Sequence, residues 1–183
     1  MLLACDVSGS MQHSISDRSK VELYDIGLLL AMLLKNRCAQ VISGMFGNIW
    51  KVVNLPSTGI LANTMELRRR EGEVGYSTNG HLVIKWLNEQ KMAMDKVMMF
   101  TDCQMWNSYR DGDSMRGEWH RYKAIAPNAK LYLFDLAGYG QMPLSMVEKD
   151  VYLIAGWSDK VFDVLEAIEG GSNALKEISN TKI

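Results

Sequence analysis

Cysteine and proline are scarce in this sequence, with three residues of each type among 183. Cys5, Cys38 and Cys103 are widely spaced and form no C-x-x-C pair, so they predict neither a disulfide framework nor a zinc site. We therefore expect three reduced thiols in or near the core of a cytoplasmic protein.

Long apolar segments are also missing. The longest, residues 26–34, has nine residues, whereas a membrane-spanning helix needs about 20. The first residues lack the charged segment and the cleavage site of a secretory signal. We expect a buried helix at 26–34 and no association with a membrane.

Neither sign of charge is in excess: Lys and Arg number 20, Asp and Glu number 21, and the net charge is −1. This balance argues against a dedicated nucleic-acid arm or a polybasic membrane module. The length suits a single domain, residues 1–183. Because only Met1 precedes the first apolar run, we expect that domain to be a fragment of a longer protein.

Short apolar runs alternate with longer helical patterns along the whole chain. Continuous apolar runs predict buried strands at residues 2–5, 41–46, 96–101, 130–134 and 151–155. Residues 49–53 follow the turn signal Gly47-Asn48 and predict the second strand of a hairpin. Helices are predicted at residues 20–36, 58–70, 79–90, 114–126 and 159–169. This order predicts an α/β fold: a doubly wound, mostly parallel six-stranded sheet with one antiparallel edge strand and helices on both faces.

A loop rich in oxygen ligands, Asp6-Val-Ser8-Gly-Ser10, directly follows the first predicted strand. Ligands of doubly wound sheets bind beyond the carboxyl ends of the strands, so this loop lies where a site is expected. Its carboxylate and two hydroxyls are hard ligands suited to Mg²⁺, Mn²⁺ or Ca²⁺ rather than zinc. The same residue types also cap turns and helices, so the loop alone leaves a structural interpretation equally open.

Two further segments favour the metal site. Thr78 lies at the start of a predicted helix, and Asp102 directly follows the predicted strand at 96–101. They add a third hydroxyl and a second carboxylate at element boundaries. We expect the three loops to converge at one end of the sheet, which makes the combined pattern more specific than any of its parts.

These oxygen-bearing residues resemble the metal-ion-dependent adhesion site of von Willebrand factor A (vWA) domains, on the pattern Asp6-x-Ser8-x-Ser10, Thr78 and Thr101-Asp102. The order of the predicted elements, including the hairpin, matches that fold along nearly the whole chain. A narrower resemblance is to the A domain at the C-terminal end of Ro autoantigen (TROVE) proteins. It rests on Val97-Met-Met-Phe-Thr-Asp-Cys103, residues 122–136 and Ile154-Ala-Gly-Trp-Ser158.

The vWA resemblance implies a division of roles around Mg²⁺ or Mn²⁺. Ser8 and Ser10 would bind the ion directly, and Thr78 would do so when a ligand is present. Asp6 and Asp102 would act largely through bound water. One coordination position would be filled by the exposed carboxylate of a partner protein, and no catalysis is implied.

The Ro resemblance also bears on RNA. Ro proteins carry a large ring of helical repeats before the A domain, and that ring is implicated in binding small structured RNAs. Nothing in these 183 residues could form it. We therefore expect RNA binding to belong to a missing part of the protein.

An aromatic segment follows Asp102 and includes Trp106, Tyr109 and Arg110. These side chains could form a platform that contacts a partner beside the open metal position. Alternatively, Trp106 and Tyr109 fold back onto the sheet. The sequence leaves the two interpretations evenly balanced.

Three other functions are alternatives to metal-dependent binding: an enzyme, a scaffold and an RNA-binding component. An enzyme is disfavoured because Ser8 lies outside a Gly-x-Ser-x-Gly context, phosphate-binding loops are absent, and no acid–base pair is evident. Cys103 is interpreted as a structural thiol that points away from Asp102 along the strand. Two rivals stay open: a scaffold with a vestigial metal loop, and a ribonucleoprotein component that contacts RNA through Arg116, His120, Arg121 and Lys123.

Overall fold

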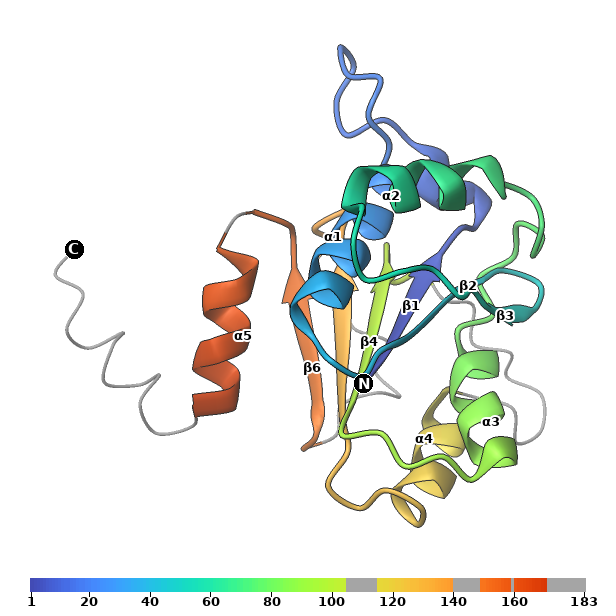
Figure 1. Cartoon of the computed structure of the whole chain (residues 1–183), viewed down its shortest axis with the longest axis vertical. Helices are drawn as coiled ribbons and strands as arrows, with labels where there is room; N and C mark the ends of the chain where they lie inside the picture. Colours follow the sequence, from blue (N-terminus) through green and yellow to red (C-terminus); the bar gives the residue numbers. More distant parts are fainter. Residues whose placement is uncertain (105–114, 140–148, 159, 171–183) are drawn as a thin grey trace, which may run out of the picture.

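One six-stranded sheet organises the molecule, which is a computed structural model that describes residues 1–104, 115–139, 149–158 and 160–170 (Figure 1). The strands lie in the order β3-β2-β1-β4-β5-β6. Only β3 runs antiparallel, against β2, and the other pairs are parallel. This confirms the predicted sheet. The strands are β1 Leu2–Asp6, β2 Ile42–Phe46, β3 Trp50–Val52, β4 Lys96–Thr101, β5 Lys130–Asp135 and β6 Val151–Ala155.

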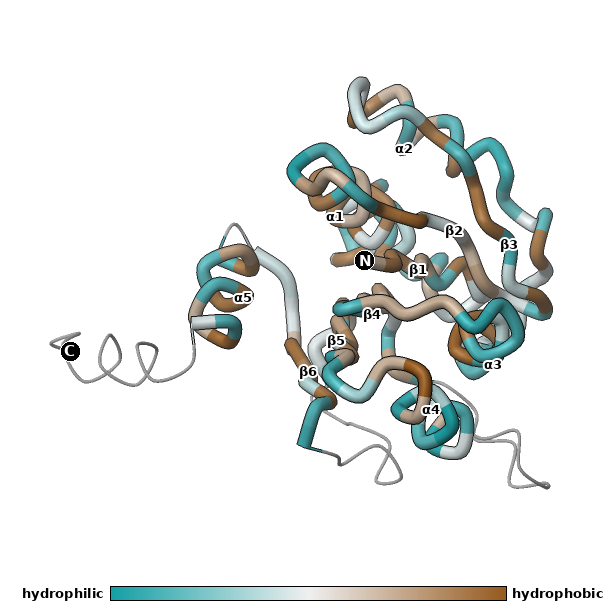
Figure 2. Tube along the Cα trace, turned by 60° about the horizontal axis from the view of Figure 1, so that its bottom comes forward, coloured by the Kyte–Doolittle hydropathy of each residue, from teal (hydrophilic) through white to brown (hydrophobic). Residues whose placement is uncertain are grey.

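Helices cover both faces of the sheet, as Figures 1 and 2 show. Helices α1, α2 and α5 pack on one face, and α3 and α4 pack on the other. None of the helices in the described ranges is long and apolar enough to cross a membrane. The helices are α1 Leu23–Arg37, α2 Ile60–Arg69, α3 His81–Gln90, α4 Met115–Lys123 and α5 Val161–Gly170, with a short 3₁₀ turn at Gly9–Gln12.

The continuous apolar run of β1 follows from its central position. Alternate residues point to opposite faces of a strand, so Leu3 and Cys5 join the core under α1, whereas Leu2 and Ala4 join the core under α3 and α4. The chain passes from β1 to β2 on one side and later crosses to β4 on the other. The winding therefore reverses between β1 and β4, and their carboxyl ends are where ligand sites of such folds form.

Helices α1, α2, α3 and α5 each begin two or three residues later than the sequence predicts. Helix α1 begins at Leu23 rather than residue 20, because Glu22 and Asp25 form a capping box. Helix α3 begins at His81 rather than residue 79, and the Asn79 backbone N–H that precedes it donates to Gly47 O at 3.2 Å. Thr78 lies in a non-helical segment, residues 75–79.

Candidate metal centre

Asp6 ends β1 and is almost completely buried, with 1% of its surface exposed. Both of its carboxylate oxygens are held: Oδ1 accepts from the Ser8 backbone N–H at 2.9 Å, and Oδ2 accepts from the Thr101 hydroxyl at 2.7 Å. Thr101 ends the neighbouring strand β4, and its Oγ1 also accepts from the Cys103 N–H at 3.1 Å. Two adjacent strands therefore set the position of this carboxylate.

Ser8 and Ser10 lie together just beyond Asp6. Their Oγ atoms are 3.1 Å apart. Two oxygen ligands at right angles on one Mg²⁺, each at about 2.1 Å, would lie roughly 3.0 Å apart. The hydroxyl pair thus has the spacing that adjacent positions of an octahedral ion require.

Asp102 directly follows β4 and is also buried, with 2% exposed. Its Oδ1 accepts from the Gln104 N–H at 3.1 Å. Because β1 and β4 are parallel neighbours, Asp6 and Asp102 both lie at the carboxyl end of the sheet. The two carboxylates come from segments 96 residues apart in the sequence.

Thr78 is buried, with 6% exposed, although no helix or strand contains it. Its segment is tied to the serine loop because the Gly9 N–H donates to Tyr76 O at 3.0 Å. It is tied to the β2–β3 turn through Asn79 and Gly47. The structure thus brings the Thr78 segment to the loop that follows β1.

Cys103 does not continue β4, so the strand alternation predicted from the sequence does not set the direction of its side chain. Its φ of +57° turns the chain out of the strand. Burial raises the pKa of its thiol to about 12, and the charges of Asp135, Asp102 and Asp6 add to the shift. A thiol held protonated in this way is a poor nucleophile.

Two buried carboxylates, Asp6 and Asp102, characterise this end of the sheet. Burial raises the pKa of the Asp6 carboxyl to about 7, the hydrogen bonds from Ser8 and Thr101 oppose the shift, and the charge of Asp102 adds to it. None of the ion pairs between residues in the described ranges involves Asp6 or Asp102. A bound cation would relieve this charge.

The donor set fits a hard cation. Within the described part of the chain, no group of three or more His, Cys, Asp or Glu side chains lies close enough to hold a metal. An ion here would therefore depend on two carboxylates and on hydroxyls, which are oxygen ligands. Mg²⁺ and Mn²⁺ suit this set, and zinc does not.

The contact that Thr101 makes was not predicted from the sequence, in which Thr101 was only part of the Thr101-Asp102 motif. The structure makes its hydroxyl the link between the end of β4 and Asp6, across 95 residues of sequence. The sequence showed only that a hydroxyl residue ends a buried strand. Hydroxyl residues are also common in ordinary strands, so this signal did not single out Thr101. The suggested platform of Trp106, Tyr109 and Arg110 lies outside the described residues.

The cationic residues of α4 are partly compensated within the domain. Arg121 pairs with Glu118 on the same helix. Lys123 Nζ donates to Ala129 O at 2.8 Å and to Asp150 Oδ2 at 2.9 Å. Arg116 and His120 are exposed on this helix. Because Arg121 and Lys123 pair with acidic side chains, the four residues suggested for RNA contact offer less positive charge to RNA than the sequence implies.

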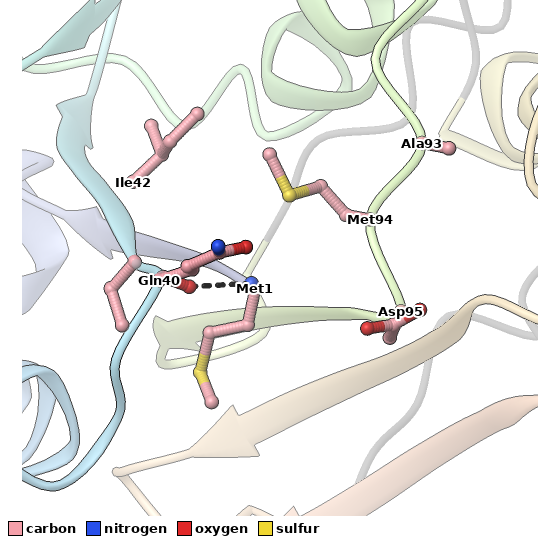
Figure 3. Close-up of a pocket in the computed structure, with 7 residues that line it drawn as sticks. Met1, Gln40, Ile42, Ala93, Met94 and Asp95 are labelled. Carbon is pink, nitrogen blue, oxygen red and sulfur yellow. Dashed lines mark hydrogen bonds between the residues drawn. The ribbon is translucent and has the colours of Figure 1, made fainter.

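A cavity of about 290 Å³ lies at the opposite, amino end of the sheet (Figure 3). The Met1 ammonium donates to Gln40 O at 2.9 Å beside it, and Asp95 supplies the carboxylate at its wall. The remaining lining residues are Val41, Ile42, Ala93 and Met94. It offers no cluster of oxygen ligands comparable with the loops at the carboxyl end.

The parallel sheet with one antiparallel edge strand, helices on both faces and polar loops at the reversal point define an α/β domain of the vWA type. More narrowly, the chain belongs to the family of Ro60 vWA domains, whose model matches residues 1–168. This confirms the resemblance to the A domain of Ro proteins. No curated protein sequence is significantly similar to the chain.

Solved structures support the fold. The Ro (RSR) protein of Deinococcus radiodurans superimposes with a TM-score of 0.71 at 15% identity, over 93% of this chain and 34% of that one. BatB of Bacteroides thetaiotaomicron gives a TM-score of 0.54 at 13% identity, with 98% of both chains covered. An aerotolerance-related membrane protein of Bacteroides fragilis gives 0.52 at 14% identity, over 94% of this chain and 98% of that one. The chain thus spans about a third of the Deinococcus protein.

Proposed function

We propose that this domain binds Mg²⁺ or Mn²⁺ and, through the ion, the carboxylate of a partner protein, without catalysing a reaction. The ion would be held by Asp6, Ser8, Ser10, Thr78 and Asp102. The observation that carries the proposal is the pair of buried carboxylates, Asp6 and Asp102, at the ends of adjacent strands beside two hydroxyls 3.1 Å apart. Burying such charges is costly unless they are paired or bind a metal.

The ligand count explains the choice of partner. Two carboxylates only neutralise a divalent ion, and hydroxyls are weak ligands. The ion would still attract an anionic oxygen, and Mg²⁺ retains waters that such an oxygen can displace. A carboxylate from an Asp or Glu side chain of another protein meets that requirement.

The first experiment is calorimetric titration of Mg²⁺ and Mn²⁺ into the metal-free protein and into an Asp6→Ala/Asp102→Ala double variant. Asp95→Ala is the matched control, because it removes an exposed carboxylate from the amino end of the sheet. We expect binding to the wild type and to the control but not to the double variant. Equal binding to all three would place the ion elsewhere and contradict the proposal.

The partner's carboxylate can be tested with acetate as the probe. Water bound to protein-held Mn²⁺ accelerates proton relaxation in the solvent. We expect acetate to lower this relaxivity by displacing a bound water, whereas chloride at the same ionic strength leaves it unchanged. An unchanged relaxivity with acetate would contradict a carboxylate as the sixth ligand.

The two rivals have distinct signatures. A scaffold with a vestigial loop would show the same melting temperature with and without millimolar Mg²⁺. Direct RNA contact would show affinity that falls steeply with salt. We place any RNA binding of a longer Ro-like protein outside residues 1–183, because Arg121 and Lys123 already pair with acidic side chains.

The compartment is also a proposal. All three cysteines are free, and Cys5 and Cys103 have pKa values raised to about 12, in each case mainly by burial. Unpaired structural thiols suit a reducing compartment. We therefore propose that the domain acts in the cytoplasm.

A further inference from the structure

Thr78 is the candidate ligand that regular structure supports least. Asp6 and Asp102 are anchored by strands β1 and β4, whereas Thr78 lies in the non-helical residues 75–79. Its position must therefore come from contacts with neighbouring segments. The turn between β2 and β3, residues 47–49, supplies several of them.

Asn48 bonds to this segment on both sides of Thr78. Its side-chain Oδ1 accepts from the Ser77 N–H at 2.9 Å, and its backbone N–H donates to Val74 O at 2.7 Å. Its carbonyl accepts from Asn79 Nδ2 at 3.4 Å. The preceding residue, Gly47, accepts from the Asn79 N–H at 3.2 Å.

Two glycines make this close approach feasible. A Cβ on Gly47 would overlap the carbonyl oxygen of Gly75. Gly75 itself has a φ of +75°, and a Cβ there would overlap the side chain of Asn48. The turn and the segment therefore fit one another only with glycine at both positions.

The same segment also contacts the serine loop, through the hydrogen bond from the Gly9 N–H to Tyr76 O. Hydrogen bonds thus run without interruption from Asn48, through residues 76 and 77, to the loop that carries Ser8 and Ser10. Asn48 is exposed, so its side chain contributes the hydrogen bond from the Ser77 N–H rather than core packing.

We infer that Asn48 is a positioning residue that holds Thr78 at the ion, and that it thereby sets the affinity of the centre for Mg²⁺. The inference rests on the proposed function, because it requires an ion at the site. Residues that orient metal ligands typically contribute about 10- to 100-fold to metal affinity.

The test is a double-mutant cycle of Asn48→Ala and Thr78→Val, with the dissociation constant for Mg²⁺ measured by calorimetry in saturating acetate, which supplies the carboxylate in whose presence Thr78 is expected to bind the ion. We expect each single variant to weaken binding about tenfold. If Asn48 acts through Thr78, the double variant binds no more weakly than Thr78→Val alone, because coupled residues are non-additive. Effects that multiply, or an Asn48→Ala constant within about twofold of the wild type, would overturn the inference.

A matched control separates positioning from simple loss of stability. Asn63 in α2 also clamps a loop, since its Nδ2 donates to Pro56 O at 2.7 Å and to Thr58 O at 3.1 Å. We expect Asn63→Ala to lower the melting temperature without changing Mg²⁺ affinity. Equal weakening by Asn63→Ala and Asn48→Ala would show that Asn48 acts only through stability, which overturns the inference.

A second variant and the wild-type titration cover the remaining outcomes. Should Asn48→Ala not fold, Asn48→Ser withdraws the acceptor from the Ser77 N–H while retaining a residue suited to turns. A wild-type protein that binds neither Mg²⁺ nor Mn²⁺ contradicts the proposed function and this inference together. Wild-type binding that Asn48→Ala leaves unchanged contradicts the inference alone.

Discussion

The two ends of the sheet handle charge in opposite ways. At the amino end, cations meet anions: Lys96 and Lys130, which begin β4 and β5, both pair with Glu169 of α5, and Lys123 pairs with Asp150. At the carboxyl end, the buried Asp6 and Asp102 take part in no ion pair within the described ranges. Their partners are backbone N–H groups and one hydroxyl.

The charges at the amino end of the sheet stabilise the fold, whereas those at the carboxyl end would bind a ligand. The amino-end pairs join α4 and α5 to the sheet and its adjoining segments, so their charges are already compensated. The Asp6 carboxylate weakens the fold in the absence of a cation, since burial raises its pKa and so disfavours its ionised form. Functional sites commonly retain such locally unfavourable groups.

The strongest test of this contrast is Asp6→Asn. The substitution removes a buried charge beside Asp102 and keeps a carbonyl oxygen for the Ser8 N–H. Its amide nitrogen cannot accept from the Thr101 hydroxyl, as Oδ2 does, and would instead donate to Thr101 Oγ1. We expect the metal-free variant to melt about 2–4 °C higher, which corresponds to roughly 1 kcal/mol in a domain of this size. We expect its Mg²⁺ affinity to fall about 100-fold, because ligand charge sets affinity.

Calorimetry and thermal melts with and without Mg²⁺ measure both effects of Asp6→Asn. Glu169→Gln is the matched acid-to-amide change at the amino end. A metal-free Asp6→Asn protein that melts below the wild type would contradict the idea that Asp6 destabilises the empty fold.

The second prediction concerns Thr101→Val, which is nearly isosteric. It withdraws the hydroxyl from Asp6 Oδ2 and the acceptor from the Cys103 N–H. We expect the free energy of unfolding to fall by about 2 kcal/mol and Mg²⁺ affinity to fall about tenfold. Urea denaturation and calorimetry would measure these changes, and unaltered affinity would show that Thr101 does not orient Asp6.

The third prediction tests the amino end through pH. Partial burial favours a higher pKa for Glu169, but the hydrogen bonds from Tyr132 and Lys96 outweigh it and hold the pKa below its ordinary value of 4.5. A lowered pKa means that Glu169 stabilises the fold above about pH 4.5 and that this stabilisation is lost as pH falls through the folded-state value. Glu169→Gln should therefore cost about 1 kcal/mol at pH 7.

Urea denaturation of the wild type and Glu169→Gln across pH 3–7 tests this prediction. The stabilities of the two proteins should converge below pH 4, and their Mg²⁺ affinities should match at pH 7. A stability difference that persists at low pH would mean that packing, rather than charge, accounts for the effect.

The smallest effect is expected for Lys123→Met. Lys123 is 24% exposed and pairs with Asp150, which is 37% exposed, so solvent screens the pair. We expect a loss of at most about 1 kcal/mol in thermal denaturation. Any change in Mg²⁺ affinity would contradict the separation of the two ends of the sheet.

Much of the fold could be predicted because its signals are local. The runs at residues 2–5 and 97–100 are apolar without alternation, which is the pattern of strands covered on both faces. The loop Asp6-Val-Ser8-Gly-Ser10 places three oxygen ligands within five residues. These features, together with the order of the elements, were sufficient to predict the sheet and the end of it where the candidate site lies.

The tertiary structure decided what depends on partners distant in the sequence. Thr101 reaches Asp6 across 95 residues, and Ser77 meets Asn48 across 29. The Asn79 N–H, just before helix α3, donates to Gly47 of another turn. Local propensity cannot register such contacts, since they form only when the sheet brings its loops together. The sequence alone therefore determined the architecture and most candidate ligands, whereas the folded chain determined how those ligands are held.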